Sequence, residues 1–95
     1  MHEYINPSYF TACADLSHFL TVARVPFKVE QAFDGFKFTF PWCKGDCILH
    51  RGSFEHHFGM FESYRFPWDN GDVSTHTAAA MAALLAQYFR EKTEE

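Results

Sequence analysis

The feature that most constrains the fold is a period-two pattern in the first half of the chain. Apolar residues alternate with polar or small ones through residues 27–33 and again through residues 36–42. Asp34-Gly35 between the two runs is a dipeptide typical of a tight hairpin turn. Alternation places one side of each strand in a core and the other side in solvent. The sequence therefore predicts an antiparallel hairpin with one apolar face.

Helical periodicity precedes this hairpin. Asn6-Pro7 is a helix-start signal, because asparagine caps helices and proline is tolerated in the first turn. Apolar residues then recur at spacings of three and four until Pro26, which cannot continue a helix. A first helix is predicted at about residues 7–24.

The middle of the chain adds strands. Residues 47–50 predict a short third strand and residues 59–66 another, whereas residues 51–58 fit either a loop or an extra strand. We place Tyr64 on the inward side of the later strand, although Glu62 interrupts that face.

The end of the chain predicts a second helix. Asp72 or Ser74 can cap an alanine-rich helix over residues 75–91, and residues 90–95 read as a frayed, charged tail.

Together these elements give the order α-β-β-β-(β)-α in one domain spanning residues 1–95, because so short a chain cannot enclose two cores. The predicted fold class is α+β, a two-layer sandwich in which an antiparallel meander of three to four strands carries both helices on one face.

This order, with an alanine-rich last helix, resembles the double-stranded-RNA-binding domain. That family opens its second helix with lysines that bind phosphate, where this chain has Ser-Thr-His-Thr at residues 74–77. The resemblance implies the fold, and RNA binding follows from it only by analogy.

The motif Phe-Pro-Trp-x-x-Gly-Asp-x-x-x-His occurs twice, at residues 40–50 and 66–76. Proline cannot donate to a sheet and Gly-Asp favours turns, so the simplest interpretation is that two strands end in the same way. We expect the first copy to continue into a strand and the second to open a helix. The copies would then differ in geometry and would not be a duplicated set of metal ligands.

Both copies leave the sheet at the same edge if residues 51–58 add no strand. The two indoles would then lie ~10 Å apart, two strand spacings, beside the N-terminus of the last helix. Indoles, carboxylates and a helix start suit a small-molecule or peptide site. Its candidate residues are Trp42, Trp68, Lys44, Asp46, Asp69, Asp72 and His76.

Four residues are candidate zinc ligands: Cys43, Cys47, His50 and His57, with His56 as an alternative to His57. Thiolate and imidazole are the donors that zinc prefers. Cysteine is also often simply buried, so we expect no cofactor, with zinc as the alternative.

The polar face of the sheet is a candidate interface. Alternation places six residues there, namely Lys28, Lys37, Thr39, Ile48, Phe61 and Arg65. A mildly basic face with apolar residues is suited to docking or dimerisation.

Composition narrows the function. The net charge is −4 and no run of lysine or arginine occurs, which disfavours nucleic acid. No apolar stretch reaches the ~20 residues that span a bilayer, the N-terminus does not resemble a signal peptide, and an odd number of cysteines suits a reducing cytoplasm.

The first functional hypothesis is a small cytoplasmic binding or interaction module. It would self-associate as a homodimer or bind a protein partner through the open sheet face or an edge strand, because aromatic residues make up 19% of the chain and exceed what one small core hides. The alternatives are a zinc- or ligand-binding protein and, by fold analogy, an RNA-binding domain. No catalytic arrangement emerges from the spacing, so enzyme activity is left open.

Overall fold

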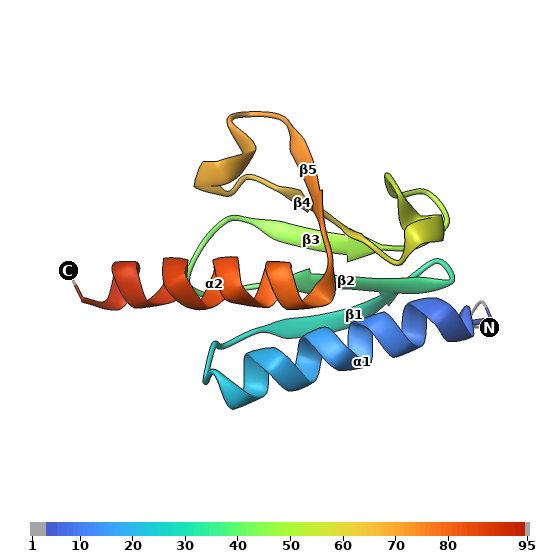
Figure 1. The fold of residues 1–95 in the computed structure, drawn as a ribbon, viewed down its shortest axis with the longest axis horizontal. Helices are drawn as coiled ribbons and strands as arrows, with labels where there is room; N and C mark the ends of the chain where they lie inside the picture. Colours follow the sequence, from blue (N-terminus) through green and yellow to red (C-terminus); the bar gives the residue numbers. More distant parts are fainter. Residues whose placement is uncertain (1–3, 95) are drawn as a thin grey trace.

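The computed structural model describes residues 4–94 as a two-layer α+β sandwich (Figure 1). Within these residues five antiparallel strands form one meander in the order β1-β2-β3-β4-β5, and two helices lie side by side on one face. The strands are β1 (Lys28–Ala32), β2 (Gly35–Thr39), β3 (Asp46–Leu49), β4 (Phe61–Tyr64) and β5 (Val73–His76). The helices are α1 (Pro7–Val22) and α2 (Ala78–Thr93), and the 3-10 turns are η1 (His56–Phe58) and η2 (Pro67–Asp69). The predicted fold class is confirmed, with one strand more than expected.

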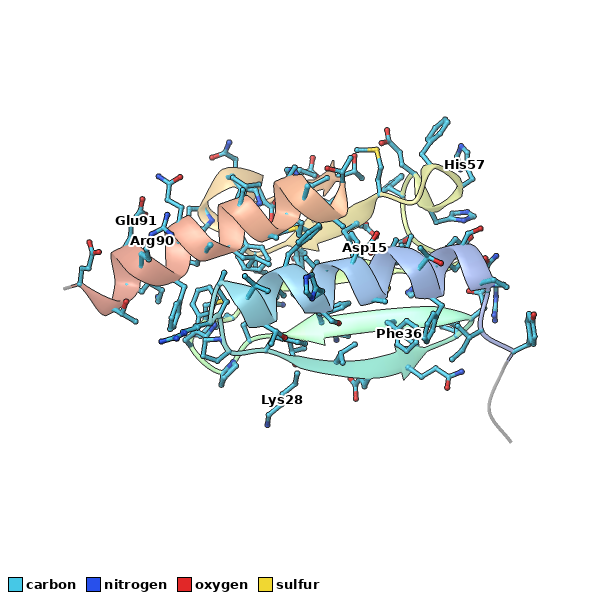
Figure 2. The ribbon with its side chains drawn as sticks, turned by 60° about the horizontal axis from the view of Figure 1, so that its bottom comes forward. Asp15, Lys28, Phe36, His57, Arg90 and Glu91 are labelled. Atoms are coloured by element: carbon cyan, nitrogen blue, oxygen red, sulfur yellow. The ribbon has the colours of Figure 1, made fainter. Side chains whose placement is uncertain are left out.

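Helix α1 begins where the sequence indicates. The side chain of Asn6 accepts a hydrogen bond from the backbone N–H of Ser8 at 2.9 Å, and Pro7 occupies the first turn. The apolar stripe of the helix is buried against the sheet: Tyr9, Cys13, Leu16 and Leu20. Figure 2 shows α1 lying over β1 and β2, with Phe36 of β2 below it.

The β1–β2 turn is shifted by one residue from the predicted one. Phe33 and Asp34 form the turn, and Gly35 is already the first residue of β2. Gly35 lies so close to β3 that an added Cβ would be 1.8 Å from the carbonyl oxygen of Leu49. The glycine is therefore required by contact between strands, and the turn must precede it. Phe33 consequently leaves the predicted strand and is exposed.

Residues 51–58 add no strand to the sheet, and η1 lies in this segment. The register of β4 is the opposite of the predicted one. Phe61 and Ser63 are fully buried on the helix side, whereas Glu62 is half-buried and Tyr64 is exposed. The prediction that Phe61 lies on the open face is therefore wrong.

Residues Val73–His76 form β5, where the sequence suggested the opening of a helix. They pair with β4 in the register Phe61↔His76 to Tyr64↔Val73. Helix α2 begins only at Ala78, where the Thr77 hydroxyl accepts from the backbone N–H of Ala80 at 3.2 Å. It continues through Thr93, so most of the expected charged tail is helical, and Glu95 lies outside the described residues.

The largest fully buried side chains come from both layers: Phe38, Phe61, Leu16, Leu20, Leu49, Met81 and Leu85. They belong to one cluster between the sheet and the helices. Throughout residues 4–94 every buried side-chain nitrogen or oxygen has a hydrogen-bond partner. Neither α1 nor α2, the α-helices of that range, combines the length and apolarity needed to cross a bilayer.

The packing of the core predicts which thiols react. Cys13 and Cys47 are 3% and 0% exposed, and burial raises the pKa of Cys13 to about 12 and that of Cys47 well above its usual value. Cys43 is half-buried. We expect iodoacetamide to alkylate Cys43 alone in the folded protein and all three cysteines in denaturant, as read by peptide mass spectrometry. Modification of Cys13 or Cys47 at the rate of Cys43 in native buffer would contradict this packing.

Candidate functional site

The two Phe-Pro-Trp segments come together in space. They form the β2–β3 and β4–β5 connections, which lie at the end of the sheet toward which α2 runs (Figure 1). The rings of Phe40 and Phe66 meet edge to face with centroids 5.8 Å apart. Trp42 and Trp68 both meet Tyr88 of α2 edge to face, at 5.4 and 5.8 Å. We call these five residues the aromatic corner.

The repeated motif is therefore a repeated structural unit. Each copy begins just after one strand ends, and it covers the connection at the aromatic corner and the whole of the next strand. The glycines act differently in the two copies. A Cβ on Gly45 would lie 2.4 Å from the ring of Phe66, whereas Gly71 has open space around it and a positive φ of 80°. Gly45 is required because its neighbours leave no room for a side chain, and Gly71 is favoured because its backbone adopts a positive φ.

A buried carboxylate organises the second connection. Asp69 is only 4% exposed, yet its Oδ1 accepts hydrogen bonds from the hydroxyls of Ser63, at 2.7 Å, and Ser74. Its Oδ2 accepts from the backbone N–H of Phe66 at 3.1 Å. The indole N–H of Trp68 donates to the Ser63 oxygen at 3.2 Å. These bonds compensate for burying the charge, and they fix Trp68 beside Tyr88.

The same cluster contains serine, histidine and aspartate, but in an order unsuited to nucleophilic catalysis. Ser74 Oγ and His76 Nε2 are 2.7 Å apart. A carboxylate can only accept, so the Ser74 hydroxyl donates to Asp69, and Ser74 then accepts from His76 when Nε2 carries the hydrogen. A catalytic serine gives its proton to histidine, which this arrangement does not allow. The cluster holds β4, β5 and η2 together.

A cleft of about 560 Å³ opens beside Trp42. It is lined by Pro41, Trp42, Cys43, Lys44, Arg65, Tyr88 and Lys92. On the Trp68 side of Tyr88 a smaller hollow of about 160 Å³ includes Leu84 and Glu91. Tyr88 thus borders two depressions, of which the larger is basic and aromatic.

The structure unites only part of the predicted ligand set. Trp42 and Lys44 line the cleft, and Trp68 lies across Tyr88 from it. Asp69 is buried and hydrogen-bonded to Ser63, so its role is structural.

The remaining members of that set lie elsewhere. Asp46 is on the outer sheet face, and Asp72 is exposed and accepts from the next backbone N–H at 2.8 Å. His76 ends β5, opposite the end where the tryptophans lie, and the N-terminus of α2 follows it there. The prediction that a helix start borders the tryptophans is therefore wrong, because β5 carries the chain across the sheet before α2 begins.

Sequence reasoning missed three residues of the cleft. Arg65 had been assigned to the open sheet face, and its guanidinium does lie 5.2 Å from the ring centroid of Tyr64 on that face, but its backbone φ of 68° ends β4 and the residue also lines the cleft. Tyr88 and Lys92 are four residues apart on α2 and so share a helix face, with Lys92 Nζ 5.3 Å from the Tyr88 ring centroid. The four-residue spacing in the sequence could have predicted that Tyr88 and Lys92 lie together.

The predicted zinc ligands do not converge. Cys47 is buried under the helices, Cys43 lines the cleft, His50 follows the far end of β3, and His57 is exposed in η1. Across the described range no group of three or more histidine, cysteine, aspartate or glutamate side chains is placed to hold a metal ion. The strand direction separates these residues, because β3 carries the chain from one end of the sheet to the other.

The outer sheet face is not the basic surface that alternation suggested. Lys28, Lys37, Thr39 and Ile48 do lie on it, in register with Glu30, Asp46 and Glu62. A hollow of about 200 Å³ on this face is lined by Asp46, Ile48, Glu62, Tyr64 and Val73. Carboxylates offset the lysines because the true register of β4 turns Glu62 outward.

Comparison of the chain with protein-family models, with curated proteins and with solved structures gave no significant match.

The Asp69 cluster predicts a large effect of a small substitution. Asp69→Asn replaces an acceptor-only carboxylate that receives three donors, so we expect the free energy of unfolding to fall by about 2–4 kcal/mol. Urea denaturation followed by far-UV circular dichroism measures the change. Asp72→Asn is the matched control, and we expect it to stay within about 0.5 kcal/mol because Asp72 is exposed. Equal losses in the two variants would contradict a structural role for the buried cluster.

Stability should also depend on the protonation of His76. Burial lowers the pKa of His76, with Asp69 partly opposing, so the folded state prefers neutral imidazole more than the unfolded state does. This contribution is present above the unfolded pKa near 6.5 and is lost as pH falls through the lower, folded value. Burial lowers the pKa of His50 as well.

We therefore expect wild-type urea midpoints to drop between about pH 7.5 and pH 5, and His76→Gln to flatten part of that slope. Gln retains an N–H for Ser74, so the slope reports titration and not the loss of the bond. An unchanged slope in His76→Gln would contradict the assignment.

Proposed function

We propose that this protein is a binding module that works as a homodimer, formed by antiparallel pairing of edge strand β1 with β1 of a second copy. The observation that carries the proposal is a self-complementary pair of charges, Lys28 and Glu30, on an edge strand beside an exposed apolar hollow. The proposal keeps the binding module expected from the sequence and chooses the strand edge as its interface.

Strand β1 is open to a partner on one side. It pairs with β2 alone within residues 4–94. The hollow above this edge, of about 190 Å³, is lined by Phe10, Cys13, Ala14, Ser17, Val29 and Phe36. Phe10 of α1 and Val29 of β1 remain 56% and 44% exposed, which is high for apolar side chains that line the boundary between the helix and the sheet. A second α1 packed here would cover both.

Charge selects one register for the pairing. Paired residues in a sheet point to the same face, so the two-fold axis must pass through a residue of β1 and not between two residues. Centred on Lys28 it would oppose two lysines, and centred on Glu30 two glutamates. Centred on Val29 it places Lys28 opposite Glu30 of the partner subunit, twice. Opposite charges stabilise such cross-strand pairs and like charges destabilise them, by roughly 0.2–1 kcal/mol each.

The other surfaces suit self-association less well. Edge strand β5 carries no lysine, arginine, aspartate or glutamate, and the hydroxyl of Thr75 in it is engaged by Glu55 at 2.9 Å. The outer sheet face has carboxylates among its lysines. Lys28 points away from the helix layer (Figure 2), so pairing at the edge leaves α1 free to meet its copy.

The three cysteines are free thiols in the structure, which supports the proposed cytoplasmic location. The cluster of Asp69, Ser74 and His76 is better suited to a structural role than to catalysis.

Charge reversal tests both the dimer and its register. We expect sedimentation equilibrium of wild type to approach twice the chain mass of 11.1 kDa as concentration rises. Lys28→Glu and Glu30→Lys should each weaken association roughly tenfold or more, because each creates two like-charge contacts. The double variant Lys28→Glu/Glu30→Lys should restore it, and the two single variants should pair with one another when mixed.

Arg90→Glu is the control, since it reverses one exposed charge on α2 and none on the sheet. A wild-type protein that stays monomeric at millimolar concentration would overturn the proposal. Dimerisation that Lys28→Glu and Glu30→Lys both leave unchanged would overturn the β1 edge as its site.

A further inference from the structure

The cleft beside Trp42 concentrates positive charge in an acidic protein. The net charge is −4, yet three of the eight lysine and arginine residues line this one cleft, namely Lys44, Arg65 and Lys92. None of the side chains that line it is a carboxylate. Two of the cations lie over aromatic rings, Lys92 over Tyr88 and Arg65 over Tyr64, and Asp46 on the outer sheet face also attracts Arg65. Solvent-exposed cations that converge attract anions, and a concave surface focuses their field.

One wall of the cleft is a rigid aromatic surface. The indole N–H of Trp42 donates to the carbonyl oxygen of Pro26 at 2.8 Å. Its ring also packs on Tyr88 and on Phe89, with centroids 5.4 and 5.1 Å away. Fixed at both its polar and its apolar side, the indole is preorganised, so a flat ligand would contact it at little cost in side-chain entropy.

The size of the cleft limits the class of ligand. A volume of about 560 Å³ is in the range of small-molecule sites, roughly 300–1,000 Å³, and is too small for a folded partner. Polar and apolar groups are both present, because the lysines and Arg65 supply N–H donors while Pro41, Trp42 and Tyr88 supply apolar surface. Such a lining suits a ring at one end and an anionic group at the other.

We propose that this cleft binds a small organic anion, a flat ring that carries phosphate or carboxylate groups. The ring lies against Trp42 and Pro41, and the anionic groups are held by Lys44, Arg65 and Lys92. The proposal goes beyond the homodimer and does not rest on it, since the Lys28 and Glu30 variants leave the lining of the cleft unchanged.

Binding can be followed by tryptophan fluorescence, because Trp42 lines the cleft. The probes are adenosine diphosphate for a phosphate-bearing ring and benzene-1,3,5-tricarboxylate for a carboxylate-bearing ring, with adenosine and inorganic phosphate as half-ligands. We expect at least one of the two anionic rings to bind with a Kd below about 1 mM and each half-ligand at least roughly tenfold more weakly. Whichever ring binds more tightly identifies the anionic group.

Matched triple variants separate a site from diffuse attraction. Lys44→Gln/Arg65→Gln/Lys92→Gln should weaken binding at least roughly tenfold, because charged hydrogen bonds are lost. Arg24→Gln/Lys37→Gln/Arg90→Gln removes the same charge from outside the cleft, and we expect binding to stay within about twofold. All six residues are at the surface, and Lys92→Gln alone, near the end of α2, is the second variant should the triple variant fold poorly.

Cys43 gives an independent measurement. It lines the cleft, so a bound anion should slow its alkylation by iodoacetamide in wild type and not in the cleft variant. Failure of both anionic rings to bind wild type would overturn the proposal. So would an equal loss of binding in the two triple variants, or a bound ligand that leaves Cys43 fully reactive.

Discussion

The contact on which the rest of the structure depends is that of Tyr88 with the two tryptophans. Trp42 and Trp68 belong to different connections of the sheet, and both meet the same ring on α2. This contact fixes the C-terminal half of α2 at one end of the sheet. The helix must then start at the other end, and β5 is the segment that carries the chain there. The repeated Phe-Pro-Trp motif is thus the means by which two connections are packed on one helix.

Asp69 makes this contact specific. An aromatic cluster alone can repack in several ways, because dispersion and apolar burial have little directionality. The buried carboxylate allows few alternatives, since Ser63, Ser74 and the Phe66 N–H must all remain in place to compensate for its charge. Trp68 bonds to Ser63, so its indole is positioned by the same network. The corner therefore combines apolar packing, which supplies stabilisation, with a charged cluster that selects one arrangement.

Local pattern predicted α1, the β1–β2 hairpin and the shared end of the two Phe-Pro-Trp segments, since each follows from periodicity or from strand direction. Prediction from local pattern failed where a contact between residues distant in the sequence overrides the local preference. Gly35 looked like a turn residue, but it is glycine because Leu49 of β3 lies against it. Residues 73–76 looked like a helix start, but they pair with β4.

The register of β4 failed for a related reason. Phe61 and Ser63 face inward, and continued alternation would turn Phe66 outward. Arg65 has a φ of 68°, which interrupts the strand and returns Phe66 to the core. A positive φ in arginine has no sequence signature. The backbone conformation of Arg65 is therefore the reason that neither the inward face of β4 nor the place of Arg65 in the cleft could be predicted from the sequence.

The distribution of charge links the two proposed surfaces. An acidic domain can place its few cations anywhere that water reaches, and a random spread would be electrostatically favourable. Here Lys28 has a charge of opposite sign, Glu30, two residues away on the same edge strand, and the proposed two-fold pairing would place the two opposite each other. Lys44, Arg65 and Lys92 are instead brought together from three different parts of the chain, against their mutual repulsion. Repulsion among converging cations costs stability unless an anion relieves it, so their convergence on a preorganised indole favours the proposed anionic ligand.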